Sequence, residues 1–235
     1  MFFKFPHTPH LLWLGKTPCR EDKVLSSEEA RAFLEGEVTV EEKVDGGNIG
    51  FSLDESGGLR VQSRGHYLAR GSHPQFQPLW PWIETRRFPL IEALQPGLML
   101  FGEWCFALHS VPYKRLPDWF LGFDLYDPAV GRFWSSDRRD RWLNDLGLAA
   151  VPRLAQGRLS LEELIAMIGP SQLSDGPMEG IYLRRDQGAW LDQRAKLVRP
   201  EFVEGIGKHW SEESLEKNAL ASMSSQDRRK EKGPS

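Results

Sequence analysis

Lys43 stands in a run of β-prone residues, and the side chains around it are suited to chemistry. Glu41 and Glu42 precede it in "VEEKVDGGNIGF", and Asp45 and Asn48 follow on either side of two glycines. Burial lowers the pKa of a lysine, and a deprotonated lysine is a nucleophile. The glutamates supply acceptors beside it, and glycines let a backbone approach a ligand closely. The alternative is an edge-strand lysine that prevents aggregation.

The segment "EKVDGGN" resembles the nucleotidyl-lysine motif of the covalent nucleotidyltransferases, which include polynucleotide ligases and mRNA-capping guanylyltransferases. In that superfamily the lysine attacks the α-phosphorus of a nucleoside triphosphate and holds the nucleotide through a phosphoramide bond. The resemblance continues in the family's order over roughly residues 40–200, always on predicted strands. The further segments are "QSRGHYL" (62–68), "LMLFGEWCF" (98–106), "WFLGFDLYD" (119–127), "MEGIYLRR" (178–185) and "DQRAKLVRP" (192–200).

The resemblance implies a role for one residue in most of these segments. Glu103 would contact the ribose and Phe123 would stack on the purine, although a phenylalanine there also suits a core position. Glu179 would serve a divalent metal, Mg²⁺ or Mn²⁺, and a carboxylate can hold such an ion while the ion bridges to phosphate. Lys196 would face the phosphates.

Phosphoryl transfer depends on positioning and on neutralising charge, so cations should surround a bound triphosphate. Arg64, Arg194, Lys196 and Arg199 are the candidates, and Arg199 equally suits an exposed surface. The same cations, with the metal, are expected to keep Lys43 deprotonated by repulsion between like charges.

Two positions depart from the family pattern. The basic strand of the family has two lysines two residues apart, but the first is Arg194 here. Arginine does not readily release a proton, so Arg194 can clamp phosphate but cannot protonate the leaving pyrophosphate. Asp45 stands where some relatives have histidine, and its role is either to bind metal through water or to position the lysine.

Two observations favour the RNA ligase 2-like branch of the superfamily. Asn48 occupies a position where DNA ligases and capping enzymes carry arginine. Those enzymes also need an oligonucleotide-binding barrel after the basic strand. Such a barrel takes roughly 25–30 strand residues plus four loops, which is more than residues 201–235 provide.

The elements that must position these residues are mostly strands. Apolar and alternating runs predict strands over 38–44, 48–53, 59–63, 98–104, 119–126, 180–184 and 195–198, with a hairpin turn at Gly57 and Gly58. Helices are expected over 26–36, 136–147 and 160–169, the second capped by Ser136 or Asp137. This order predicts an α+β fold. The resemblance implies that it is an ATP-grasp-like adenylyltransferase domain of antiparallel sheets flanked by helices, with no C-terminal oligonucleotide-binding barrel.

The chain of 235 residues is 40% hydrophobic and 27% charged, as in a soluble globular protein. We expect one domain over 1–221, with a helical extension over 201–221 capped at Ser211, and a disordered tail over 222–235. No apolar run is long enough for a membrane helix, and the prolines near the N-terminus interrupt any signal peptide. Cys19 and Cys105 form no metal or disulfide framework, which favours a cytoplasmic location.

The sequence therefore predicts an ATP-dependent RNA ligase that forms lysyl-AMP and joins an RNA 5′-phosphate to a 3′-hydroxyl. The alternatives are a nick sealer for DNA or RNA–DNA hybrids, an inactive nucleotide- or RNA-binding module, and an enzyme that adenylylates something other than RNA. A partner that heals RNA ends or adds RNA affinity would suit so small a ligase. The predicted site comprises Lys43, Lys196 and Arg194 for catalysis, Glu42, Asn48, Arg64, Glu103 and Phe123 for the nucleotide, and Glu179 and Asp45 for metal.

Overall fold

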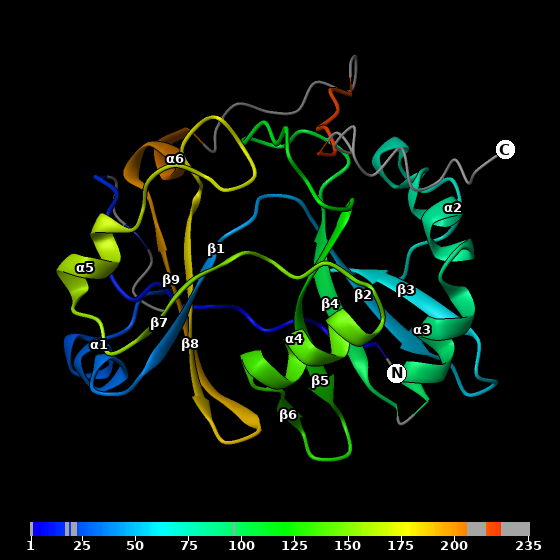
Figure 1. The fold of residues 1–235 in the computed structure, drawn as a ribbon, viewed down its shortest axis with the longest axis horizontal. Helices are drawn as coiled ribbons and strands as arrows, with labels where there is room; N and C mark the ends of the chain where they lie inside the picture. Colours follow the sequence, from blue (N-terminus) through cyan, green and yellow to red (C-terminus); the bar gives the residue numbers. More distant parts are fainter. Residues whose placement is uncertain (1, 17–18, 20–22, 96, 206–214, 222–235) are drawn as a thin grey trace, which may run out of the picture.

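Two antiparallel sheets organise the chain in the computed structural model (Figure 1), which describes residues 2–16, 19, 23–95, 97–205 and 215–221. Sheet A has the strand order β7-β1-β8-β9, with β1 at Val38–Glu42, β7 at Arg153–Gly157, β8 at Gly180–Gln187 and β9 at Trp190–Val198. Sheet B has the order β3-β2-β4-β5-β6, with β2 at Gly47–Leu53, β3 at Leu59–Ser63, β4 at Met99–Trp104, β5 at Phe120–Asp127 and β6 at Arg132–Phe133. The predicted α+β class is confirmed, and neither sheet closes into a barrel within the described ranges.

Helices cover the outer side of each sheet (Figure 1). Helices α1 (Ser27–Leu34) and α5 (Leu161–Ala166) pack on sheet A through Phe33 and Leu164. Helices α2 (Leu79–Glu84), α3 (Arg87–Leu94) and α4 (Ser136–Asp145) pack on sheet B, around the fully buried Trp104. Each sheet thus has its own apolar core. A third buried apolar cluster joins Val44 and Val151, next to β1 and β7, to Leu121 of β5, so both apolar and polar groups lie where the two sheets meet.

Helices α1 and α5 begin where the sequence predicts. Ser26 and Glu29 form a reciprocal capping box, and Ser160 and Glu163 form another, so two free backbone N–H groups are satisfied at each start. The cap predicted for α4 is wrong, because Ser135 is its N-cap residue. The backbone N–H of Ser136 instead donates to Asp186 at the end of β8 over 2.8 Å.

Helices α2 and α3 were missed by the sequence analysis because each contains a proline. Pro81 and Pro89 are the third residues of their helices. The first four N–H groups of an α-helix have no partner within the helix, so a proline there removes no hydrogen bond. None of the helices in the described part of the chain has the length and apolar character needed to cross a bilayer.

The C-terminal part differs from the prediction of a helical extension over 201–221. Helix α6 covers Pro200–Gly205, but residues 215–221 are extended and form bridges with the loop after β4. The buried Asn218 fixes them: its amide accepts from the backbone of Tyr113 at 2.8 Å and donates to the carbonyls of Cys105 and Ala107. The prediction of a helix is therefore wrong for residues 215–221. The predicted Ser211 cap and the predicted tail over 222–235 lie outside the described residues.

Candidate active site

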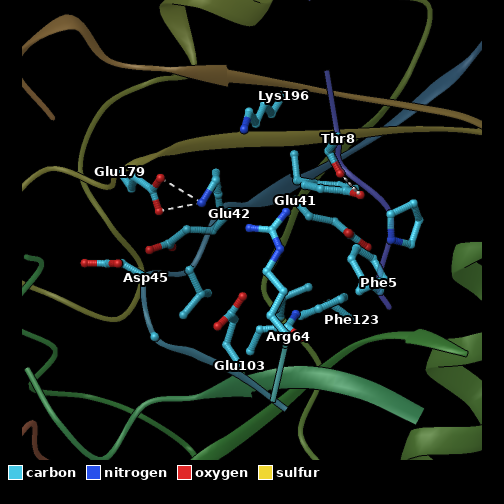
Figure 2. Close-up of a pocket in the computed structure, with 17 residues that line it drawn as sticks. Phe5, Thr8, Glu41, Glu42, Asp45, Arg64, Glu103, Phe123, Glu179 and Lys196 are labelled. Carbon is cyan, nitrogen blue, oxygen red and sulfur yellow. Dashed lines mark hydrogen bonds and ion pairs between the residues drawn. The ribbon is translucent and has the colours of Figure 1, made fainter. Parts of the chain in front are cut away.

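A cavity of about 360 Å³ opens between the two sheets, around the end of β1 (Figure 2). All of the predicted site residues except Arg194 line it. Their roles stay predictions, but the fold brings them together from strands β1, β2, β4, β5 and β9 and from the residues that flank β1, β3 and β8. The lining consists of Phe5, Pro6, Thr8, Glu41, Glu42, Lys43, Val44, Asp45, Gly46, Asn48, Arg64, Glu103, Phe123, Val151, Glu179, Tyr182 and Lys196.

Lys43 follows β1 directly and is held by an ion pair with Glu179, which precedes β8. The ammonium nitrogen lies 2.7 Å from both carboxylate oxygens, and the lysine side chain is 25% exposed. Burial works against the ammonium, but the charges of Glu179, Glu103 and Asp45 outweigh it and raise the pKa of Lys43. The carboxylates around Lys43 thus favour its ammonium form, and the expected deprotonation by cations together with a metal stays a prediction.

Glu103 and Asn48 carry polar atoms that have no hydrogen-bond partner in the part of the chain that the structure describes. They sit opposite each other in the register of β2 and β4. Oε2 of Glu103 and Oδ1 of Asn48 are both buried without a hydrogen-bond partner. Burial raises the pKa of Glu103 well above its usual range, despite the opposing charge of Lys43. Buried polar atoms without partners are costly, so this pair fits a site whose ligand supplies the missing hydrogen bonds.

Glu42 and Asp45, the acidic residues on either side of Lys43, accept hydrogen bonds from other parts of the chain. Glu42 accepts from the hydroxyl of Ser171 and from the backbone N–H of Gln172 at 2.9 Å, and burial raises its pKa. One oxygen of Asp45 accepts from the N–H groups of Ser110 and Val111 at 2.6 and 3.2 Å. Asp45 thus anchors the loop after β4.

Gly46 lines the cavity, and the protein itself also requires a glycine there. A Cβ atom at this position would lie 2.8 Å from the carbonyl oxygen of Trp104 and 3.2 Å from Sγ of Cys105. The glycine therefore lets the start of β2 pass close to β4. Its expected close approach to a ligand stays a prediction.

The carboxylates around Lys43 suit a divalent cation of the kind that the family resemblance implies. No group of three or more His, Cys, Asp or Glu side chains with metal-binding geometry occurs among the described residues. Mg²⁺ does not require one, because it is held by one or two carboxylates together with phosphate oxygens and water. Glu179 with Asp45 or Glu103 matches that donor set.

Arg194 and Arg199 do not line the cavity. Arg194 donates to Asp124 at 2.9 Å and stacks on the ring of Phe133 at 4.0 Å. The phosphate-clamp role predicted for Arg194 is not supported by this placement. Both oxygens of Asp124 are occupied by arginines, since Arg184 also binds this carboxylate.

A buried ion network ties sheet A to sheet B behind the cavity. The fully buried Arg139 of α4 pairs with Glu41 of β1, and its Nη1 donates to the carbonyl oxygen of Phe123 at 2.6 Å. Arg184 of β8 donates to the same carbonyl at 3.1 Å and pairs with Asp124. These two arginines therefore fix the strand that carries Phe123 relative to the strand that leads to Lys43.

Tyr182, Phe5 and Thr8 were missed by the sequence analysis. Tyr182 could have been found, because Ile181 and Leu183 are buried in the core of sheet A and the residue between them must point to the other face. Phe5 and Thr8 precede every motif, and no local pattern links them to the site.

Two antiparallel sheets that flank a lysine pocket are the architecture of a nucleotidyltransferase domain, and the comparisons with known proteins agree. A family model described as RNA ligase matches residues 36–198, which is more than half of the chain. The chain belongs to the RNA ligase family, and the resemblance seen in the sequence is confirmed.

Solved structures of the Naegleria gruberi RNA ligase are similar in fold. A mutant with ATP and Mn gives a TM-score of 0.61 at 19% identity, over 85% of this chain and 63% of that chain. An apo mutant gives 0.60 at 19% identity, over 77% and 55%, and a form with pyrophosphate gives 0.57 at 22%, over 72% and 51%. The chain thus spans about half to just under two thirds of those proteins. No curated protein matches it.

Proposed function

We propose that the protein is an ATP-dependent RNA ligase in which Lys43 carries AMP. The carrying observation is the ion pair between Lys43 and Glu179 on the wall of a pocket with charged groups at one end and aromatic rings at the other (Figure 2). Nζ of Lys43 attacks the α-phosphorus of ATP and pyrophosphate leaves. AMP then passes to an RNA 5′-phosphate, and a 3′-hydroxyl attacks that phosphate and releases AMP.

Lys43 must lose a proton before it can attack. Glu179 is the nearest acceptor, at 2.7 Å, and burial with the charge of Asp45 raises the pKa of Glu179, although Lys43 opposes this. A carboxylate with a raised pKa is a better proton acceptor. A Mg²⁺ or Mn²⁺ ion, for which Glu179 and Asp45 are the candidate ligands, would supply positive charge to the phosphates once the proton has left Glu179.

The other lining residues can bind ATP as the resemblance implies. Glu103 offers an unpartnered oxygen to a ribose hydroxyl, and Phe123 offers a flat ring to the base. Arg64 and Lys196 supply positive charge for the phosphates. Asn48 supports RNA as the substrate, as in the RNA ligase 2-like branch.

The test is incubation of the protein with α-labelled ATP and Mg²⁺ or Mn²⁺, followed by transfer. We expect an acid-labile label on the protein that is discharged by RNA with a 5′-phosphate. No label would contradict the proposal and leave a binding module. Discharge by nicked DNA alone would favour a DNA nick sealer, and discharge by neither nucleic acid would favour another acceptor.

Phosphate binding should weaken as the pH rises through about 8. Burial, together with the charges of Lys43 and Arg64, lowers the pKa of Lys196 to about 8. Below this pH Lys196 is an ammonium that attracts phosphate, and above it the charge is lost. We expect the affinity for inorganic tripolyphosphate, measured by calorimetry, to fall several-fold between about pH 7 and about pH 9.

Lys196→Arg is the matched control, because arginine stays charged over this range. Any change of affinity with pH that remains in this variant comes from ionisation of the tripolyphosphate itself. Equal pH profiles for the wild type and Lys196→Arg would show that Lys196 is not the titrating group.

A further inference from the structure

The first described residues of the chain run from sheet B to sheet A, as the dark-blue trace shows (Figure 1). Phe5, Pro6 and Thr8 of this segment line the pocket. The carbonyl of Phe3 accepts a hydrogen bond from Gln62 of β3 over 2.6 Å. At the other end, the backbone of Lys196 in β9 donates to Pro9 at 3.0 Å and accepts from Leu11 at 2.9 Å. We call residues 3–11 the N-terminal strap. Because it is fixed to both sheets, the residues between its ends are held in place over the cavity.

Phe5 is the residue of the strap that enters the aromatic end of the pocket. Its ring meets that of Phe123 at 5.2 Å between centroids and at 78°, so the two rings form a corner. Phe101 and Phe133 pack against Phe5 from behind at 5.1 and 5.6 Å. Phe5 is 7% exposed, and both rings of the corner line the cavity.

Thr8 closes the same end of the pocket. Its hydroxyl lies 2.9 Å from the hydroxyl of Tyr182 on β8, and both residues line the cavity. Figure 2 shows Phe5, Phe123 and Thr8 on one side, and Glu179 and Asp45 on the opposite side. One end of the cavity therefore has two aromatic rings and a rim of hydroxyls, beside a Glu41 carboxylate that is paired with Arg139, and it suits a flat heterocycle. The other end has the ammonium groups of Lys43 and Lys196 beside the carboxylates, and these ammonium groups suit phosphates.

We propose that the middle of the N-terminal strap, from Phe5 to Thr8, is part of the nucleotide site, and that Phe5 with Phe123 forms the corner that holds the purine base. This inference rests on the proposed function, since it names what the aromatic end of that site binds. Phe5 lies outside residues 36–198, the part of the chain that the family model matches. The strap thus adds a wall to the site that the matched segment does not contain.

The test is ATP-dependent labelling of the protein by Phe5→Ala, with Phe3→Ala as the matched control. Phe3 is in the same strap and packs on Phe101, Tyr126 and Phe133, but it does not line the cavity. We expect Phe5→Ala to raise the half-saturating ATP concentration about 5- to 20-fold, since a lost aromatic contact weakens base binding. The rate at saturating ATP should change less than about twofold, because Phe5 is remote from the charged end. Phe3→Ala should change neither value beyond about twofold.

Inhibition by inorganic tripolyphosphate distinguishes a loss of base binding from general damage to the site. It has no base, so its inhibition constant should be the same in the wild type and in Phe5→Ala. The inference is overturned if Phe5→Ala weakens the binding of tripolyphosphate as much as the binding of ATP. It is also overturned if Phe3→Ala has the same effect as Phe5→Ala. Unchanged half-saturation in Phe5→Ala also overturns it. Absence of labelling in the wild type would instead contradict the proposed function, so the two failures are distinct.

Discussion

Lys43→Arg is expected to abolish labelling of the protein by α-labelled ATP, with a loss of at least about 1,000-fold in rate. Arginine keeps the positive charge that pairs with Glu179, so the pocket should still fold and bind ATP. It cannot readily give up a proton, so it does not become a nucleophile. This substitution therefore separates the covalent role of Lys43 from its charge. The measurement is the amount of labelled protein against time, with ATP affinity determined by calorimetry.

Lys196→Arg is the matched control for Lys43→Arg. Lys196 also lines the cavity but has no ion pair with Glu179. If its role is to attract phosphate, an arginine should keep labelling within about tenfold of the wild type. Labelling of Lys43→Arg at the wild-type rate would exclude Lys43 as the nucleophile. Loss of ATP binding in Lys43→Arg would assign the defect to the pocket as a whole.

The strands that carry the site could be predicted because their signal is local. β2, β3, β4 and β5 alternate or are apolar, and their observed bounds differ from the expected ones by one residue at most. The hairpin is also confirmed, with Gly57 at a φ of +80° in the turn. The order of the motifs along the chain was then enough to predict which residues line the cavity, apart from Arg194.

The ion pair of Lys43 could not be predicted, because its partner is distant in the chain. Glu179 is 136 residues away, and only the pairing of β1 with β8 brings it within 2.7 Å. The course of the N-terminal strap could not be predicted for the same reason, because Phe3 and Pro9 are held by the distant strands β3 and β9. The extended conformation of 215–221 depends on backbone groups of the loop after β4, which Asn218 binds. In each case tertiary hydrogen bonds decided what the local pattern could not.

Arg139→Met is expected to lower the free energy of unfolding by about 3–5 kcal/mol. The Arg139 side chain is 0% exposed and its partner Glu41 is 1% exposed. Without Arg139, the remaining arginine near Glu41 is Arg184, at 3.8 Å. A buried carboxylate without a close partner is costly, and the carbonyl of Phe123 loses one of its two arginine donors. The measurement is urea unfolding followed by tryptophan fluorescence.

Arg153→Met provides the matched control at the exposed end of the same network. Arg153 pairs with Asp137 and Asp140 at 2.7 Å, but its side chain is 29% exposed, so solvent screens these pairs. Its loss should cost no more than about 1 kcal/mol.

The double substitution Arg139→Met with Glu41→Met tests whether the unpaired charge is the cause of the expected loss. Removing both members leaves no buried carboxylate to satisfy, so at least about half of the stability lost in Arg139→Met should return. If Arg139→Met costs no more than Arg153→Met, the ion network does not hold the two sheets together. If the double variant is as unstable as Arg139→Met, the loss comes from the contacts of Arg139 with Phe123 and Asp140. That second result would place the stabilising effect of Arg139 on the strand that carries Phe123.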